Sequence, residues 1–96
     1  MIERLIHTDY LELDVSGSPP VGGWDPARVG GDPTAALRAP SYNPVTIRVL
    51  AGSGTLTVTM PGGSRTLTLN VGDFEQLTFS RITAKSGITS IRVGYA

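Results

Sequence analysis

The chain of 96 residues contains no cysteine and carries eight basic and eight acidic side chains, so its formal net charge is zero. The absence of cysteine excludes disulfides, thiolate metal sites and thiol nucleophiles, and the zero net charge argues against nucleic acid as the main partner. No apolar run approaches the ~20 residues of a membrane helix, and residues 1–10 lack the apolar core of a signal peptide. We therefore expect one domain, made in the cytoplasm, with no membrane partner.

The charges are unevenly distributed along the chain. Residues 1–37 hold six acidic and two basic side chains, whereas residues 38–96 hold two acidic and six basic ones. The two parts therefore have opposite net charge. This arrangement suits attraction within one fold, and it also suits head-to-tail contact between copies.

The first 44 residues divide into a predicted strand and a segment of a different character. In residues 9–16 (DYLELDVS), apolar side chains at 11, 13 and 15 alternate with polar ones, which predicts a half-buried strand. Residues 17–44 hold six of the seven prolines and five of the twelve glycines, so extended ladders are not expected there. Within this segment, Asp32 is a suitable N-cap and Pro33 a suitable first residue for one short helix that Pro40 ends.

The apolar side chains of residues 17–44 need a surface to cover, because a plain flexible linker would be polar. The segment is therefore expected either to fold over its own body or to lie across a neighbouring subunit as an arm. The sequence predicts an N-terminal strand or arm (1–16), a Pro/Gly-rich extended segment (17–44) and a β-sandwich or barrel body (45–96). As an arm, residues 1–44 would be removable without unfolding the body.

From residue 45 onward the sequence is nearly all strand. Apolar residues alternate with threonine on both sides of a Pro-Gly turn in residues 52–73, which predicts a β-hairpin with a threonine-lined face. Further strands are predicted at 45–50, 74–79, 80–85 and 88–96, and Phe74 is out of phase with Leu77 and Phe79, which indicates a bulge or bend near Glu75 and Gln76. The predicted fold class is all-β, a small antiparallel sandwich or barrel of about six to eight short strands.

No catalytic constellation is found in the sequence. The one histidine, His7, has Asp9 two residues on, but no serine lies in a Gly-x-Ser-x-Gly elbow, so an exposed or interface imidazole is the simpler interpretation. The acidic residues 9, 12 and 14 lack calcium-loop spacing, and Asp73 and Glu75 fit a turn better than a glycosidase pair. We expect no catalytic residues, no metal site and no cofactor.

The arginine and tryptophan content of the chain favours a role in protein–protein contact over a role in catalysis. Seven of the eight basic residues are arginine, which makes rigid bidentate contacts, and tryptophan and arginine are typical of interface hot spots. The single tryptophan, Trp24, could also be a packing anchor of the chain's own core. The candidate interface residues are Trp24, Leu37, Tyr42, Arg28, Arg38 and Arg48.

Two resemblances suggest different functions. Residues 49–79 (VLAGSGTLTVTMPGGSRTLTLNVGDFEQLTF) resemble the central hairpin of cupins, but the positions around Leu56, Val58 and Met60 hold none of that family's metal-binding histidines. This similarity implies at most a metal-free barrel that binds a small ligand such as a carbohydrate, with Trp24 and the threonine-lined surface as its contacts.

The second resemblance is to small β-rich virion proteins of tailed phages and gene transfer agents, of the capsid-decoration or head-spike base type. It rests on residues 47–96, with the turn AKSGITS before a last strand, and on the Pro/Gly-rich segment before them. It implies a non-enzymatic structural protein located in the virion. Its partners would be copies of itself, with a trimer as one candidate, and a capsid or other virion protein, with no direct contact to nucleic acid.

Overall fold

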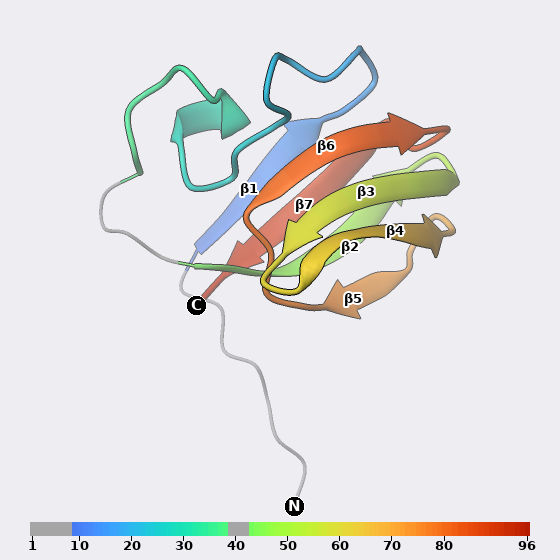
Figure 1. Cartoon of the computed structure of the whole chain (residues 1–96). Helices are drawn as coiled ribbons and strands as arrows, with labels where there is room; N and C mark the ends of the chain where they lie inside the picture. Colours follow the sequence, from blue (N-terminus) through green and yellow to red (C-terminus); the bar gives the residue numbers. More distant parts are fainter. Residues whose placement is uncertain (1–8, 39–42) are drawn as a thin grey trace, which may run out of the picture.

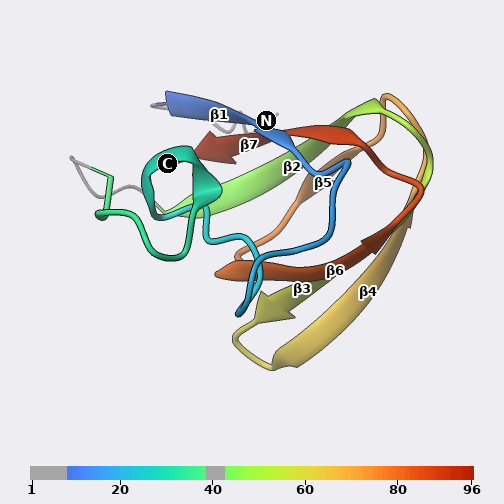
Figure 2. The same ribbon diagram turned by 90° about the horizontal axis from the view of Figure 1, so that it is seen from above.

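The structure is a computed structural model that describes residues 9–38 and 43–96. In these ranges the chain forms seven antiparallel strands in two facing sheets, which makes a sandwich and not a closed barrel (Figures 1 and 2). One sheet has the order β1-β7-β2-β5 and the other β4-β3-β6. The strands are β1 Asp9–Asp14, β2 Pro44–Ala51, β3 Gly54–Met60, β4 Gly63–Leu69, β5 Phe74–Gln76, β6 Arg81–Ser86 and β7 Ser90–Tyr95. The predicted all-β class is confirmed.

The core lies between the two sheets and is built by period-two alternation. Every second side chain of a strand points inward, so the apolar positions of each strand meet those of the opposite sheet. The fully covered side chains of the strands are aliphatic or aromatic and come from β2, β3, β6 and β7: Ile47, Val49, Leu56, Val58, Ile82, Ile91, Val93 and Tyr95. The outward positions alternate with them and are free to carry other side chains.

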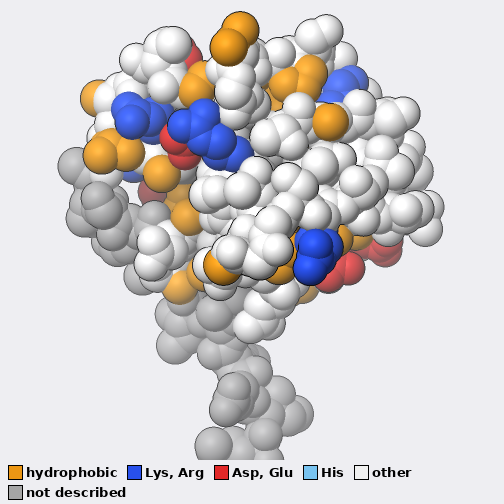
Figure 3. All heavy atoms as spheres, viewed as in Figure 1, with side chains coloured by type: hydrophobic (Ala, Val, Ile, Leu, Met, Phe, Trp, Pro, Cys, Tyr) orange, Lys and Arg blue, Asp and Glu red, His pale blue; other side chains and the backbone are white. Residues whose placement is uncertain are grey.

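The hairpin predicted for residues 52–73 is formed by β3 and β4. The two strands pair from Gly54 with Leu69 to Met60 with Gly63, so a two-residue turn joins them. Leu56 and Val58 are buried, and the hydroxyls of Thr57 and Thr66 lie 3.0 Å apart on the outer face. The threonine-lined face is therefore confirmed as the outer surface of this sheet. Figure 3 shows this side of the molecule, with few charged side chains over β3.

The strand predicted for residues 74–79 is shorter than expected, because β5 ends at Gln76. Phe74 is 46% exposed on the outer face of its sheet, whereas Phe79 is 3% exposed and lies in the core. The change of phase seen in the sequence therefore marks the place where the chain leaves one sheet and crosses to β6 in the other. A break in the strand, and not a bulge within a ladder, accounts for the pattern.

The prediction of a short helix that begins at Asp32 is wrong, because residues 32–38 form no helix. The one helical element in the described part of the chain is a 3-10 turn, η1 (Val29–Gly31), which contains Gly30 at φ +65°. The Asp32 carboxylate does accept hydrogen bonds from the Thr34 backbone N–H at 2.8 Å and from its hydroxyl at 2.7 Å. The chain does not continue as a helix, however, because Leu37 pairs with Arg28 in an isolated β-bridge.

Residues 17–38 fold over the chain's own sandwich, which is the first of the two alternatives for this segment. The Trp24 backbone N–H donates to the Ile82 carbonyl at 2.9 Å, and the Ile82 N–H donates to the Trp24 carbonyl at 3.0 Å. Gly23 sits at φ +82°, and a Cβ there would lie 2.5 Å from the Ile82 carbonyl oxygen. Only glycine allows the backbone to approach β6 this closely.

Residues 9–38 are therefore part of the folded body and do not form a separate arm. Strand β1 pairs with β7 along its whole length, and Leu13, Val15 and Trp24 are members of the core. A fragment that starts at residue 45 would lack one strand of a four-stranded sheet and these three core side chains. The expectation of a self-sufficient body therefore does not fit the structure.

Candidate functional site

The outer face of the sheet β1-β7-β2-β5 carries two rows of residues in cross-strand register. The first row runs from Glu12 on β1 through Arg92 on β7 and Arg48 on β2 to Phe74 on β5. The second row starts at Tyr10 on β1, and its later members on β7, β2 and β5 are Gly94, Thr46 and Gln76. Four strands that are distant in the sequence thus place aromatic and basic side chains on one surface.

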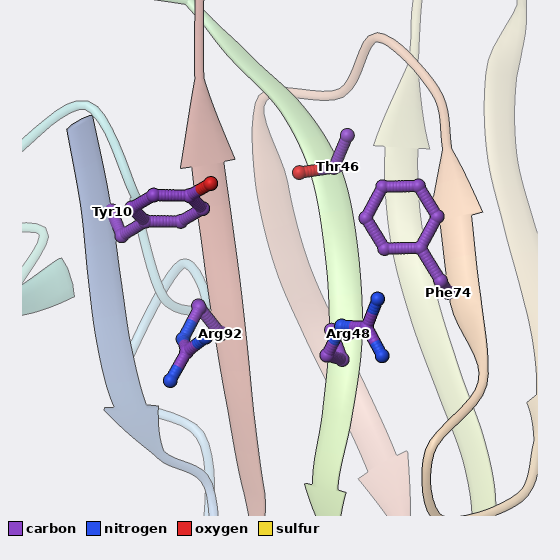
Figure 4. A pocket seen from close by; sticks show the side chains of 5 residues that line it. All are labelled: Tyr10, Thr46, Arg48, Phe74 and Arg92. Carbon is purple, nitrogen blue, oxygen red and sulfur yellow. The ribbon is translucent and has the colours of Figure 1, made fainter. Parts of the chain in front are cut away.

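A pocket of about 460 Å³ lies on this surface. We call it the outer-face pocket, and the residues that line it are Tyr10, Thr46, Arg48, Phe74 and Arg92 (Figure 4). Tyr10 and Phe74 come from the two edge strands, and Arg92 and Arg48 come from the two central strands between them. Gly94 adds no side chain between Tyr10 and Thr46, which leaves room at this position of the second row.

The Arg92 guanidinium is held by groups of the chain itself. Its Nη2 donates to Glu12 Oε1 at 3.0 Å, and its Cζ lies 5.6 Å from the centre of the Tyr10 ring. The ion pair satisfies the charge of this arginine, and the ring contact adds a weaker cation–π attraction. Arg92 therefore forms one fixed wall of the outer-face pocket.

The Arg48 guanidinium has a different environment. Its Cζ lies 5.0 Å from the centre of the Phe74 ring, within cation–π distance. Among residues 9–38 and 43–96, no carboxylate is paired with it. Arg48 also stands directly opposite Arg92 in the sheet, and two like charges in such a cross-strand pair repel each other. An anion placed beside Arg48 would relieve this repulsion.

The outer-face pocket can bind and orient a ligand, but its described lining has no group suited to proton transfer near neutral pH. Two guanidiniums, two aromatic rings and one threonine hydroxyl line it, with no imidazole and no carboxylate. In the described ranges, no three His, Cys, Asp or Glu side chains are grouped so that they could hold a metal ion. Nor does this part of the chain contain a helix long and apolar enough to cross a membrane.

The other candidate interface residues lie mostly in the segment 17–38 and are tied to the chain itself. Trp24 is only 8% exposed, so it is a packing anchor of the chain's own core and presents little ring surface to a sugar or a partner. Arg28 Nε lies 3.3 Å from Asp25 Oδ2, and Arg28 Nη1 donates to the Ala35 carbonyl at 2.7 Å. Basic side chains gather over this segment in Figure 3.

Arg38 and Leu37 lie at the end of this segment and differ in exposure. Arg38 pairs with Asp9 and stacks over the Tyr95 ring with its Cζ 4.6 Å from the ring centre. Leu37 is 58% exposed and is the one predicted apolar anchor that the described structure places on the surface. Tyr42 and His7 lie outside the described residues.

Of the five candidate interface residues that the structure describes, only Arg48 lies in the outer-face pocket, and sequence reasoning missed Tyr10, Thr46, Phe74 and Arg92. The signal for Tyr10 was present, because it occupies the polar face of the strand predicted at 9–16. The phase of Phe74 was also visible. The two rings lie on the same surface only because of the order of the strands in the sheet. The alternation of residues within one strand gives no information on that order.

The Tyr95 hydroxyl is a buried structural group on the inner side of the same sheet. It donates to the Pro26 carbonyl at 2.6 Å, and burial raises the pKa of Tyr95 to about 12. The hydroxyl therefore stays protonated at any physiological pH and fastens the segment 17–38 to β7.

Comparisons of the chain with protein-family models, with curated proteins and with solved structures give no match. The site must therefore be interpreted from its own chemistry.

Proposed function

We propose that this chain is a non-enzymatic structural subunit of a virion, of the capsid-decoration or head-spike base type, which assembles through protein–protein contacts. The observation that carries the proposal is the outer-face pocket, where two half-exposed aromatic rings and two arginines lie side by side on a sheet face. Its partners would be copies of the chain and a neighbouring capsid or other virion protein.

The composition of the outer-face pocket is that of an interface core. Aromatic residues and arginine are enriched at interfaces and dominate hot spots, because they bury much area at low entropic cost. Tyr10 is 54% and Phe74 46% exposed. Since a buried ring covers about 150–250 Å², completing the burial of both would contribute on the order of 4–6 kcal/mol before the costs of association.

The same arrangement does little for the stability of the isolated chain. Arg48 and Arg92 are opposed like charges in one cross-strand pair, and Tyr10 and Phe74 leave about half of their surface exposed in the monomer. Groups that oppose or do not serve folding are typical of surfaces used for binding. This pattern supports a contact role for the outer face.

The virion setting is supported by the resemblance of residues 47–96 to small β-rich virion proteins and by the non-catalytic lining of the outer-face pocket. An all-β sandwich tied down by a proline-stiffened segment is also suited to a part that remains in a long-lived particle.

The experiment is quantification of the chain by mass spectrometry across a density gradient of particles released by cells that encode it. We expect the chain to peak with the particles, at a copy number relative to the capsid protein that is constant between preparations. A chain confined to the free protein fraction would overturn the proposal.

A further inference from the structure

The two cross-strand rows on the outer face of the sheet β1-β7-β2-β5 hold one more positive charge than the carboxylate within them neutralises. In the first cross-strand row, Glu12 is paired with Arg92 at 3.0 Å, whereas Arg48 has no carboxylate partner within the described ranges. The second row adds no charge, because its members are Tyr10, Gly94, Thr46 and Gln76. The two rows together therefore carry two guanidiniums and one carboxylate, an excess of a single positive charge.

The position of Arg48 suits a carboxylate ligand. A guanidinium that stacks on an aromatic ring uses its face for that contact and keeps the N–H groups at its edge for hydrogen bonds. Those N–H groups form a planar fork that matches the two oxygens of a carboxylate. Arg48 lies 5.0 Å from the Phe74 ring centre and lines the outer-face pocket next to that ring (Figure 4).

The size and walls of the outer-face pocket fit an amino-acid side chain with its neighbours. Its volume of about 460 Å³ is at the lower end of the range typical of ligand pockets, ~300–1,000 Å³. Tyr10 and Phe74 offer apolar contact on either side of the two arginines. A Glu or Asp flanked by apolar residues matches both features, with the carboxylate at Arg48 and the flanks against the rings.

We propose that the outer-face pocket receives an acidic segment of a neighbouring protein subunit, with one Glu or Asp carboxylate bound to the Arg48 guanidinium. This inference rests on the proposed function, because it names the chemistry of the partner at the same surface. A single carboxylate balances the excess charge of the two rows. A nucleic-acid backbone brings many phosphates and is favoured by a broad basic surface, which the Glu12 carboxylate in the first row interrupts.

The experiment titrates the full-length chain with the capped pentapeptide GLELG and with its neutral counterpart GLQLG. Binding is followed by NMR through the side-chain Nε–H resonance of Arg48 and through the backbone amide resonances of β2 and β7, which the Arg48 variant retains. We expect a saturable shift of this resonance with GLELG and at least tenfold weaker binding of GLQLG. Arg48→Gln should weaken GLELG binding at least tenfold.

The matched control is Arg65→Gln. Arg65 also has no carboxylate partner among the described residues, but it lies on β4 in the other sheet and donates to the Ser64 carbonyl. Its replacement should leave GLELG binding unchanged. An equal loss in both variants would indicate general charge attraction and would overturn the proposal.

Three further outcomes would overturn it: no saturable shift, equal binding of the two peptides, or tighter binding of inorganic phosphate or oligo-dT than of GLELG. Because the titration uses the isolated chain, its outcome is separate from that of the particle gradient. A chain found in particles that does not bind GLELG would refute this inference alone. A chain absent from particles that binds GLELG would refute the virion assignment alone.

Discussion

Replacement of Trp24 by alanine tests whether the segment 17–38 belongs to the folded body. Trp24 is 8% exposed, packs in the core between the sheets and is bridged to Ile82 by two backbone hydrogen bonds. Large-to-small changes of a buried tryptophan cost about 3–5 kcal/mol, because they remove apolar burial and leave a cavity. A domain of this length has a free energy of unfolding of about 5–15 kcal/mol. The substitution should therefore remove a large part of the total stability.

The assay is urea unfolding followed by far-UV circular dichroism, because Trp24 is the only tryptophan and its loss removes the fluorescence probe. Leu37→Ala is the matched control, since Leu37 lies in the same segment but is 58% exposed. It should change the free energy of unfolding by less than about 0.5–1 kcal/mol. If Trp24→Ala cost less than about 1 kcal/mol, the indole would not be a core residue, and the segment would be an arm after all.

Three further results follow from the packing of residues 9–38 against the rest of the chain. Gly23→Ala should destabilise the fold more than Gly30→Ala in thermal unfolding. A Cβ at position 23 would lie 2.5 Å from the Ile82 carbonyl oxygen, whereas a Cβ at position 30 would meet nothing within 4 Å. Equal effects of the two substitutions would contradict this prediction. The pKa of Tyr95 is raised to about 12, above its ordinary value near 10, so stability should fall as pH rises from 10 to 12, since the unfolded phenol loses its proton first. A Tyr95→Phe protein that kept the same slope in this range would show that the phenol is not its source. Deletion of residues 1–44 should abolish the cooperative unfolding transition, and a fragment with native-like dispersion of NMR signals would show that the body is self-sufficient.

Local patterns in the sequence were enough to predict the elements that depend on alternation. The β3–β4 hairpin and β1 follow from period-two placement of leucine, valine and threonine around turn residues, a rule that acts within a few residues. The helix expected after Asp32 failed for a tertiary reason. The Asp32 cap and turn did form, but the Arg28–Leu37 bridge holds the following residues in an extended path.

The outer-face pocket could not be predicted in the same way. Tyr10, Arg48, Phe74 and Arg92 come from four strands, and they meet only because β7 and β2 lie between β1 and β5 in the sheet. That order depends on long-range pairing, which a single sequence does not reveal. For Trp24 the sequence left two roles open, interface contact and packing anchor, and its burial in the core favours the packing anchor.

The most direct test of assembly is the native mass of the purified full-length chain, measured by mass spectrometry under conditions that retain metals and small ligands. We expect a homo-oligomer that carries neither, with a shift to monomer when Phe74 is replaced by serine. A wild-type monomer that carries a metal or a small molecule would contradict this account and would favour a ligand-binding protein.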